Sequence, residues 1–332
     1  MNRSRFFFSF AAVLVLTAVF IFIVPSLVTP DLLHPQRIDS SYIEFQRQQI
    51  FISQPENFPS IDSTIFFNPA DLGMEYGDIK VLTADNQVLR GWYISSGDTN
   101  ANSILVLHDW NESKILKLNF AKQMHDRGFN IMLFDLRAHG NSGGNNFSPG
   151  ILSVSDVKVM LDTLLAIPFS NHVAIFGSGL SSGIALQSAL YDGRADALVL
   201  QCPFNSYSEW VKKYSRRKWG AGSFIFHPVL QRKMEDLMLM PLKDFNLAEI
   251  GSYVKTPMLM IAAGEDDWYN SIDSYAIYDS STAEKKDLIL VKKATHENIE
   301  IEGGEYYFNT IGAFINGVLP KRVIKTRNKK MT

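Results

Sequence analysis

The stretch FGSGLSSGIAL, residues 176–186, decides the fold that this sequence predicts. It begins where an apolar run over residues 173–176 ends, and such a run is typical of a strand buried on both faces. It continues into a segment of small and apolar residues, about Ser181 to Tyr191, that we interpret as a helix. Gly177 and Gly179 indicate a sharp turn between the strand and the helix.

Apolar runs and helical segments alternate on both sides of this stretch. The runs occupy residues 104–107, 130–134, 197–200, 258–262 and 288–291, and helical segments lie at about residues 115–127 and 155–167. Strands that alternate with helices of this length predict an α/β fold with a mostly parallel, twisted sheet wound by right-handed crossovers.

Shorter strand-like runs precede this alternating part. They cover residues 65–67, 79–82 and 88–94. Turn-forming residues separate them, notably Ala84-Asp85-Asn86, and this arrangement predicts antiparallel hairpins.

The alternation stops over about residues 204–253. An insertion of this length is too long for an ordinary loop, and we expect a helical cap over a site. Five of its basic side chains cluster in one short segment, at Lys212, Lys213, Arg216, Arg217 and Lys218. Such a cluster is typical of a solvated helix face, and contact with an anionic ligand or a lipid headgroup is the alternative.

The N-terminal segment, residues 6–28, contains no charged side chain. About 20 apolar residues cross a bilayer core, whereas the apolar part of a cleavable signal peptide spans only about 7–15 residues. We therefore predict that residues 1–28 form a transmembrane signal anchor in the lipid bilayer, with a removed signal peptide or a buried soluble helix as alternatives. Arg3 and Arg5 precede the apolar segment, so the positive-inside rule places the N-terminus in the cytoplasm and the globular domain outside it.

The remaining boundaries follow from composition. Residues 29–59 are polar with scattered aromatic side chains, which predicts a linker, and the globular domain covers residues 60–320. A basic tail follows at residues 321–332, and we expect it to be disordered, with anionic lipid as an alternative contact.

Composition excludes several classes of function. A formal net charge of -2 argues against a nucleic-acid-binding protein. The single cysteine, Cys202, cannot form a disulfide within the chain and lies in no metal-ligand spacing. The sequence has no phosphate-binding loop, and Gly177-Ser178-Gly179 lacks the third glycine of a dinucleotide fingerprint. We therefore predict no cofactor and no metal.

Four stretches together carry a resemblance to a known family. They are His108-Asp109-Trp110-Asn111, DLRAHGNSGG at residues 135–144, Gly264-Glu265-Asp266-Asp267, and ATHEN at residues 294–298. In this order and spacing they resemble the α/β-hydrolase superfamily, specifically its monoacylglycerol-lipase and serine-aminopeptidase-like branch, which includes membrane-anchored members. The resemblance covers about residues 65–319 and implies a sheet flanked by helices.

The resemblance implies a catalytic triad in the order nucleophile, acid, histidine. His296 matches the histidine and Asp267 matches the acid, with Asp266 as the competing acid. The pattern of the chain agrees, because both loops follow apolar runs and open α/β sheets bind ligands at the carboxyl ends of their strands. A histidine and an aspartate at that edge can carry and orient a proton.

The nucleophile position holds a glycine. A literal G-x-S-x-G pattern covers residues 179–183 and nominates Ser181 as the nucleophile. In the family, however, the nucleophile lies two residues after the glycine that ends the strand, which is Gly177 here, and that position is Gly179. Ser181 then belongs to the first turn of the helix, and Ser178 is the other nearby hydroxyl.

The resemblance also implies an oxyanion hole, formed by the backbone N–H groups of Leu180 and Trp110. These donors need no side chain, so the loss of a serine leaves them in place. Asp109, however, stands where the family has a glycine, and its negative charge would oppose an oxyanion.

These features predict a membrane-anchored protein of the α/β-hydrolase fold that lacks the usual serine. It would bind an acyl-lipid or peptide ligand, or a protein partner, with impaired turnover. The alternative is an active esterase, lipase or peptidase that uses Ser181, Ser178 or a water molecule activated by His296. A third interpretation is that Gly179 reflects an engineered knockout or a sequence error, and that the parent protein is an ordinary serine hydrolase.

Overall fold

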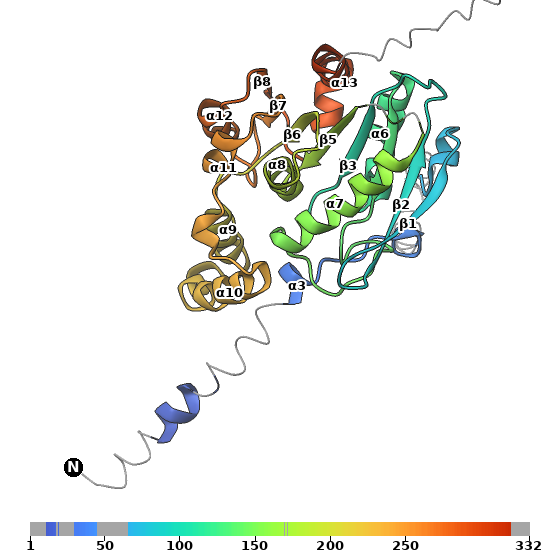
Figure 1. Ribbon diagram of the computed structural model, residues 1–332. Coiled ribbons are helices and arrows are strands. Elements are labelled where there is room, and N and C mark those ends of the chain that lie inside the picture. The colour runs from blue at the N-terminus through green and yellow to red at the C-terminus, as the bar shows by residue number, and fades with distance from the viewer. Residues whose placement is uncertain are drawn as a thin grey trace, which may run out of the picture.

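The computed structural model describes residues 11–17, 19, 30–44, 66–168, 170 and 172–319. Its centre is an eight-stranded sheet in the order β1-β2-β4-β3-β5-β6-β7-β8 (Figure 1). The strands are β1 (Gly77–Leu82), β2 (Val88–Ile94), β3 (Ser103–Leu107), β4 (Asn130–Phe134), β5 (Val173–Ser178), β6 (Ala197–Gln201), β7 (Met258–Ala263) and β8 (Lys286–Val291). β2 pairs antiparallel with β1 and with β4, and the other neighbours are parallel, so the prediction of a mostly parallel sheet is confirmed.

The burial of the strands explains why their sequences are continuous apolar runs. β3, β4, β5, β6 and β7 are buried along their whole length because helices cover both faces of the sheet. β1 and β2 form the predicted hairpin, with Leu82 opposite Val88 across a turn. The short strand expected at residues 65–67 is wrong for Phe66 and Phe67, which lie in no strand, while Ile65 falls outside the described residues.

Two layers of helices enclose the sheet (Figure 1). The helices of the α/β unit are α6 (Leu118–Asp126), α7 (Ile151–Ala166), α8 (Leu180–Tyr191), α11 (Leu247–Tyr253), α12 (Ser271–Ser280) and α13 (Ile299–Val318). α7, α8, α11 and α12 lie on one face, and α6 and α13 pack together on the other. The parallel strands therefore end at one common edge, where the loops after β3, β5, β7 and β8 meet.

The insertion between β6 and β7 is helical, as expected. α9 (Tyr207–Trp219) and α10 (Ser223–Met238) pack against each other and lie apart from the sheet (Figure 1). The expected cap boundary at residue 253 is too late, because α11 packs against α8 and α12 in the helix layer. The last residues assigned to the cap thus belong to the α/β unit.

Part of the predicted linker is attached to the domain. Short helix α3 (Pro30–Leu33) brings Leu32 and Leu33 into the core. Arg37 donates hydrogen bonds to the carbonyls of Gly140 and Ser142, at 3.2 and 2.6 Å. Residues 30–44 of the predicted linker therefore contact the domain through apolar and basic side chains.

The predicted anchor and tail fall largely outside the description. Of residues 1–28, only 11–17 and 19 are described, and the tail at 321–332 lies outside the described residues. Within the part of the chain that is described, no helix combines the length and the apolar character needed to span a bilayer.

Candidate active site

Gly179 lies at the apex of the turn between β5 and α8. Its φ is 54° and its ψ is −121°, a conformation that costs a side chain about 1–3 kcal/mol and that glycine adopts freely. Its N–H donates to the carbonyl of Gln201 at 2.9 Å, which ties the turn to the neighbouring strand β6. Gly179 is thus where the sequence placed it, and it carries no side chain into the site.

The carboxylate of Asp109 occupies the space beside this glycine. Asp109 follows β3, and its Oδ1 accepts hydrogen bonds from the backbone N–H groups of Trp110 and Leu180, at 2.6 and 2.8 Å, and from the hydroxyl of Tyr269 at 3.0 Å. A Cβ placed on Gly179 would lie 1.8 Å from Asp109 Oδ2. The two backbone donors expected to form an oxyanion hole are therefore bound to the protein's own carboxylate, in the space that a residue-179 side chain would need.

Burial makes Asp109 an unusual acid. Its side chain lies in the protein interior, and this desolvation, together with the charge of Glu112, raises the pKa of Asp109 to about 7. The hydrogen bonds from Leu180 and Tyr269 and the charge of His296 act in the opposite direction. Asp109 consequently changes its protonation state near neutral pH, where an ordinary aspartate is fully ionised.

A second, half-buried carboxylate lies close by. Glu112 accepts the backbone N–H of Asp109 at 2.9 Å and forms an ion pair with Lys117 at 2.9 Å. Burial alone would raise the pKa of Glu112, but Lys117 and the N–H of Asp109 outweigh that effect and lower it. Glu112 therefore keeps its negative charge while Asp109 more readily takes up a proton.

His296 is paired with an aspartate on the opposite side of the site. Its Nδ1 lies 2.6 Å from Oδ2 of Asp266, and the Asp266 side chain is fully buried. Asp266 Oδ1 accepts the N–H groups of Trp268 and Tyr269, at 2.6 and 2.7 Å, which fixes its orientation. Nε2 of His296 is left for other contacts, and it lies 4.0 Å from a Glu297 oxygen.

Asp267, the acid that the sequence pattern favoured, lies elsewhere. Its side chain is 91% exposed and forms an ion pair with Arg217 at 3.4 Å. The prediction of Asp267 as the partner of His296 is therefore wrong, and the competing residue, Asp266, holds that place. The loop after β7 turns so that successive side chains point to opposite sides, and only the first of the pair points inward.

The His–Asp pair has the electrostatics of a proton carrier and its orienter. Burial would lower the pKa of His296, but the hydrogen bond and charge of Asp266 outweigh it, and the pKa is raised. Burial raises the pKa of Asp266 and the hydrogen bond with His296 lowers it, and the lowering prevails. Asp266 therefore stays ionised and favours the protonated form of His296.

Neither alternative serine is presented to this site. Ser181 is buried, and its hydroxyl donates to the carbonyl of His108. Ser178 is also buried, and among the described residues its hydroxyl has no hydrogen-bond partner. Ser181 thus serves the packing of the first turn of α8 against the loop after β3.

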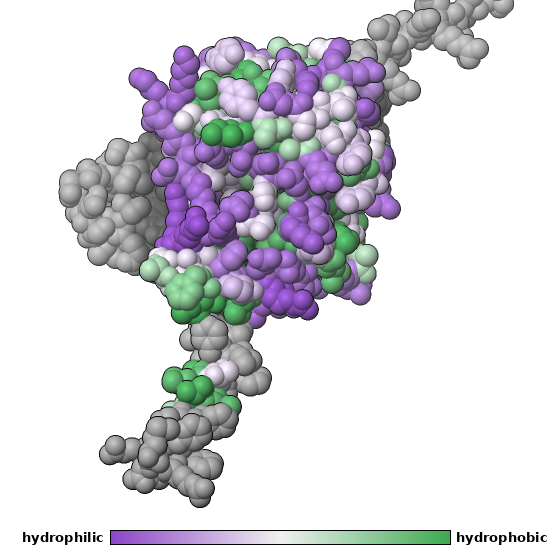
Figure 2. Space-filling view, turned by 90° about the vertical axis from the view of Figure 1, so that its left-hand side faces the viewer, coloured by the Kyte–Doolittle hydropathy of each residue, from purple (hydrophilic) through white to green (hydrophobic). Residues whose placement is uncertain are grey.

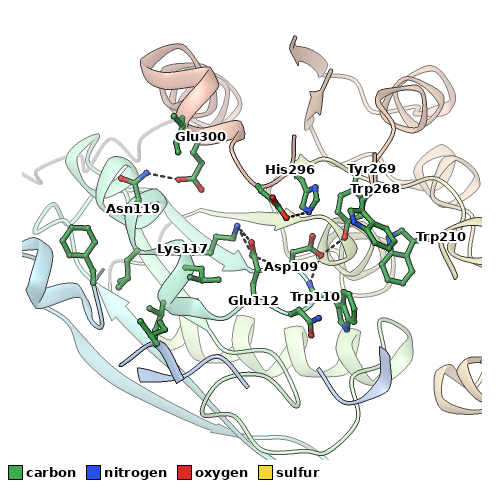
Figure 3. A pocket seen from close by; sticks show the side chains of 18 residues that line it. Asp109, Trp110, Glu112, Lys117, Asn119, Trp210, Trp268, Tyr269, His296 and Glu300 are labelled. Atoms are coloured by element: carbon green, nitrogen blue, oxygen red, sulfur yellow. Dashed lines mark hydrogen bonds and ion pairs between the residues drawn. The ribbon is translucent and has the colours of Figure 1, made fainter. Parts of the chain in front are cut away.

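A cavity of about 1040 Å³ is lined by both Asp109 and His296 (Figure 3). Its apolar lining combines aromatic and aliphatic side chains: Phe66, Trp110, Trp210, Trp268 and Tyr269, and Ile43, Ile115, Leu116, Leu118 and Ile301. Its polar lining contains Asp109, Glu112, Lys117, Asn119, His296, Glu297 and Glu300. Trp210 belongs to α9, so the cap contributes to the cavity wall as expected.

Several lining residues were not identified from the sequence. Tyr269 holds Asp109, and Glu112 pairs with Lys117, yet none of the three belongs to a recognised motif. The sequence signal at Glu112 and Lys117 is weak: the two opposite charges lie on either side of Ile115 and Leu116 in the segment that follows β3. In the described part of the chain, no group of three or more His, Cys, Asp or Glu side chains is placed to hold a metal ion.

Comparison with known proteins places this geometry in a wider context. No protein-family profile matches the chain. An uncharacterised protein, YqkD, of Bacillus subtilis is 22% identical over 281 residues, which cover 79% of this chain and 82% of that protein. The α/β hydrolase domain-containing protein WAV2 of Arabidopsis thaliana is 20% identical over 291 residues, 84% of this chain and 90% of WAV2.

Solved structures show the same architecture. An esterase of Pyrococcus furiosus superposes with a TM-score of 0.66 at 18% identity, over 86% of this chain and 98% of the esterase. At this level of identity the likeness concerns the fold. The chain has the α/β-hydrolase fold, with a mostly parallel sheet and flanking helices.

Proposed function

We propose that this protein is a ligand-binding member of the α/β-hydrolase fold in which acyl transfer through an enzyme-bound ester is blocked. One observation carries the proposal: the carboxylate of Asp109 fills the space between Gly179 and the N–H groups of Leu180 and Trp110. The cavity beside it would bind an acyl-lipid or peptide ligand. The resemblance to esterases and hydrolases supports that class of ligand.

The physical reason lies in what acyl transfer requires. A nucleophile must attack the carbonyl carbon, and donors must be free to stabilise the developing oxyanion. Here the apex residue has no nucleophile, and the two donors already bind an acceptor that carries charge when ionised. A substrate carbonyl would have to displace that carboxylate from three hydrogen bonds, so both requirements fail at one place.

A second candidate function is hydrolysis by water. The pairing of His296 with Asp266 favours it, because a histidine oriented in this way can accept a proton from a water molecule in the cavity. This route forms no covalent intermediate and needs no serine. Ser181 and Ser178 lack geometric support, since both are buried away from the cavity lining.

The two candidates separate in a labelling experiment with a fluorophosphonate probe. We expect no labelling of the native chain, weak labelling of Gly179→Ser, and strong labelling of Asp109→Gly/Gly179→Ser, in which the donors and the serine are both available. Labelling of the native chain that disappears in Ser181→Ala would overturn the proposal. An esterase rate in the unlabelled native chain that His296→Ala abolishes would establish the water route instead.

We also propose that residues 1–28 anchor the protein in a membrane, with the domain on the extracytoplasmic side. The cap supports a position near a bilayer, since Phe224 and Leu239 are 75% and 67% exposed. Figure 2 shows a mostly hydrophilic surface with a group of apolar side chains at its lower edge. Membrane fractionation and protease accessibility of intact cells test both points.

A further inference from the structure

The polar lining of the cavity has an excess of negative groups. Four carboxylates face it, whereas the basic groups in the lining are one lysine and the site histidine. The carboxylates belong to Asp109, Glu112, Glu297 and Glu300, and the basic groups to Lys117 and His296. Lys117 is already paired with Glu112, and His296 with Asp266, which lies behind it. The charge of Asp109 is therefore left without a dedicated cationic partner among the described residues.

One oxygen of Asp109 is available to a ligand. Oδ1 accepts three hydrogen bonds, from Trp110, Leu180 and Tyr269. Oδ2 accepts none from the described residues, although the residue is only 5% exposed and lines the cavity. Figure 3 shows the Asp109 carboxylate between His296 and Trp110. It lies next to the aromatic wall of the cavity, which consists of Trp110, Trp210, Trp268 and Tyr269. Because Oδ2 takes no donor from the described residues at the cavity wall, it can accept a hydrogen bond from a ligand or lie beside a ligand's positive charge.

The aromatic wall suits the same kind of ligand. The faces of tryptophan and tyrosine rings attract cations, most strongly where water is excluded. Trp268 already shows this property, because the guanidinium of Arg217 lies 4.2 Å from the centre of its ring. Trp110 and Trp210 pack edge to face with their ring centres 5.8 Å apart, and both line the cavity. They form an apolar surface within the same cavity as Asp109.

We infer that the cavity binds an organic cation, an ammonium group attached to an apolar or aromatic body. The ammonium group takes the place beside Asp109 Oδ2, and the body lies against Trp110, Trp210 and Trp268. This inference rests on the proposed function and narrows its ligand class, since among the acyl-lipid and peptide ligands proposed for the site it selects those that carry an ammonium group. The inference makes the positive charge of the ligand the main determinant of its affinity, whereas an uncharged acyl ester would contact the aromatic wall alone.

The inference has a definite pH dependence. Asp109 attracts a cation only when ionised, and its pKa is raised to about 7, so binding weakens as the pH falls through neutrality. The other titratable groups that interact electrostatically with Asp109 are Glu112, Lys117, Cys202, Tyr269 and His296. Protonation of His296 at lower pH adds a positive charge and changes binding in the same direction. A substitution at residue 109 is therefore needed to assign the effect.

The test measures binding of three matched probes to the native chain by tryptophan fluorescence and calorimetry: benzylammonium, benzyl alcohol and benzoate. At about pH 8 we expect benzylammonium to bind about tenfold more tightly than benzyl alcohol, and benzoate to bind most weakly. In Asp109→Asn the preference for benzylammonium should fall to about twofold or less. Asp267→Asn is the matched control, since that exposed acid lies outside the cavity lining, and it should keep the preference.

Several results would overturn the inference: equal binding of benzylammonium and benzyl alcohol, tighter binding of benzoate, or a preference that persists in Asp109→Asn. If Asp109→Asn fails to fold, His296→Gln decides, because its preference must still shrink between about pH 8 and about pH 5, where Asp109 takes up a proton and residue 296 no longer titrates. A preference that is the same at both values contradicts the inference. Fluorophosphonate labelling of the native chain would refute the proposed function separately, without touching the cation preference.

Discussion

The two halves of the cavity differ in how closely they follow the geometry of a serine hydrolase. On one side, His296 and Asp266 are paired at 2.6 Å, and the acid is buried and held by backbone donors. On the other, the apex of the strand-to-helix turn is Gly179, and the Asp109 carboxylate lies in the space that a side chain at residue 179 would need. The His–Asp pair and the contact between Gly179 and Asp109 come from different loops, so either arrangement can be present without the other.

Gly179 and Asp109 form a reciprocal fit, in which the missing side chain of one leaves room for the carboxylate of the other. Glycine at residue 179 leaves room that a serine would fill, and Asp109 uses that room to reach three donors. Any side chain at residue 179 would expel the carboxylate from its place. Gly179 and Asp109 are therefore expected to be coupled energetically, whereas Asp266 and His296 form a separate unit.

The largest expected effect tests this coupling. Gly179→Ala should destabilise the protein by about 3 kcal/mol or more, because it adds backbone strain and displaces a buried hydrogen-bonded carboxylate. In an Asp109→Gly background only the strain of about 1–3 kcal/mol remains. Urea unfolding of the four chains of this double-mutant cycle gives the coupling energy.

Gly220 provides a matched control for the strain. Its φ of 54° and ψ of −128° nearly equal those of Gly179, but a Cβ there would meet no atom within 4 Å. Gly220→Ala should therefore cost only the strain. Equal losses of stability for Gly179→Ala and Gly220→Ala would show that Asp109 gives way freely, and the reciprocal fit would be refuted.

The second prediction uses pH to separate the two halves. Asp109 has a pKa raised from 3.8 to about 7, so the folded protein binds its proton more tightly than the unfolded chain does. Its contribution to stability is therefore greatest below about pH 4 and declines as the pH rises to about 7. Asp266 has a lowered pKa, and its contribution is present above its ordinary pKa and declines as the pH falls.

Difference curves isolate these opposite slopes. The free energy of unfolding of Asp109→Asn, minus that of the native chain, should increase between about pH 4 and pH 7, by an amount on the order of a few kcal/mol. The same difference for Asp266→Asn should become more negative as the pH rises through the range where Asp266 ionises in the folded protein. Parallel curves for the two variants would contradict the assignment of opposite electrostatic environments.

Only part of this site could be predicted from the sequence, and the two partners Gly179 and Asp109 show why. The place of Gly179 was predictable because an apolar run, a glycine-rich turn and a helix are local patterns with fixed periods. The place of the Asp109 carboxylate was not, because its orientation depends on donors from Leu180 and Tyr269, which are distant in the chain. The sequence indicated only that Asp109 would oppose an oxyanion.

The sequence motif does not determine which of two adjacent aspartates pairs with His296. Asp266 and Asp267 are adjacent and chemically identical, and a loop has no periodicity to say which side chain points inward. In the structure, backbone N–H groups of Trp268 and Tyr269 select Asp266. Sequence therefore located the loop and the residue type, and the backbone path decided between the two residues.

The third prediction follows the pKa of His296 by NMR. The native value should lie above 6.5, because Asp266 stabilises the imidazolium and Asp109 adds a smaller contribution. Asp266→Asn should lower this pKa most, Asp109→Asn should lower it less, and Asp267→Asn should leave it nearly unchanged. A larger change in Asp267→Asn than in Asp266→Asn would show that the pairing in solution differs from the one described.

The smallest expected effect concerns Ser181, which a literal motif search favours as nucleophile. Its hydroxyl is bound to the carbonyl of His108, so Ser181→Ala should cost about 1 kcal/mol of stability and leave ligand binding unchanged. Ser188 is a matched control, since it is buried in the same helix and donates to the carbonyl of Ile184 at 2.8 Å. Similar small losses for Ser181→Ala and Ser188→Ala identify both hydroxyls as packing groups. A loss of hydrolysis in Ser181→Ala alone would instead mean that the first turn of α8 rearranges to present a nucleophile, and the contrast between the two halves of the cavity would then disappear.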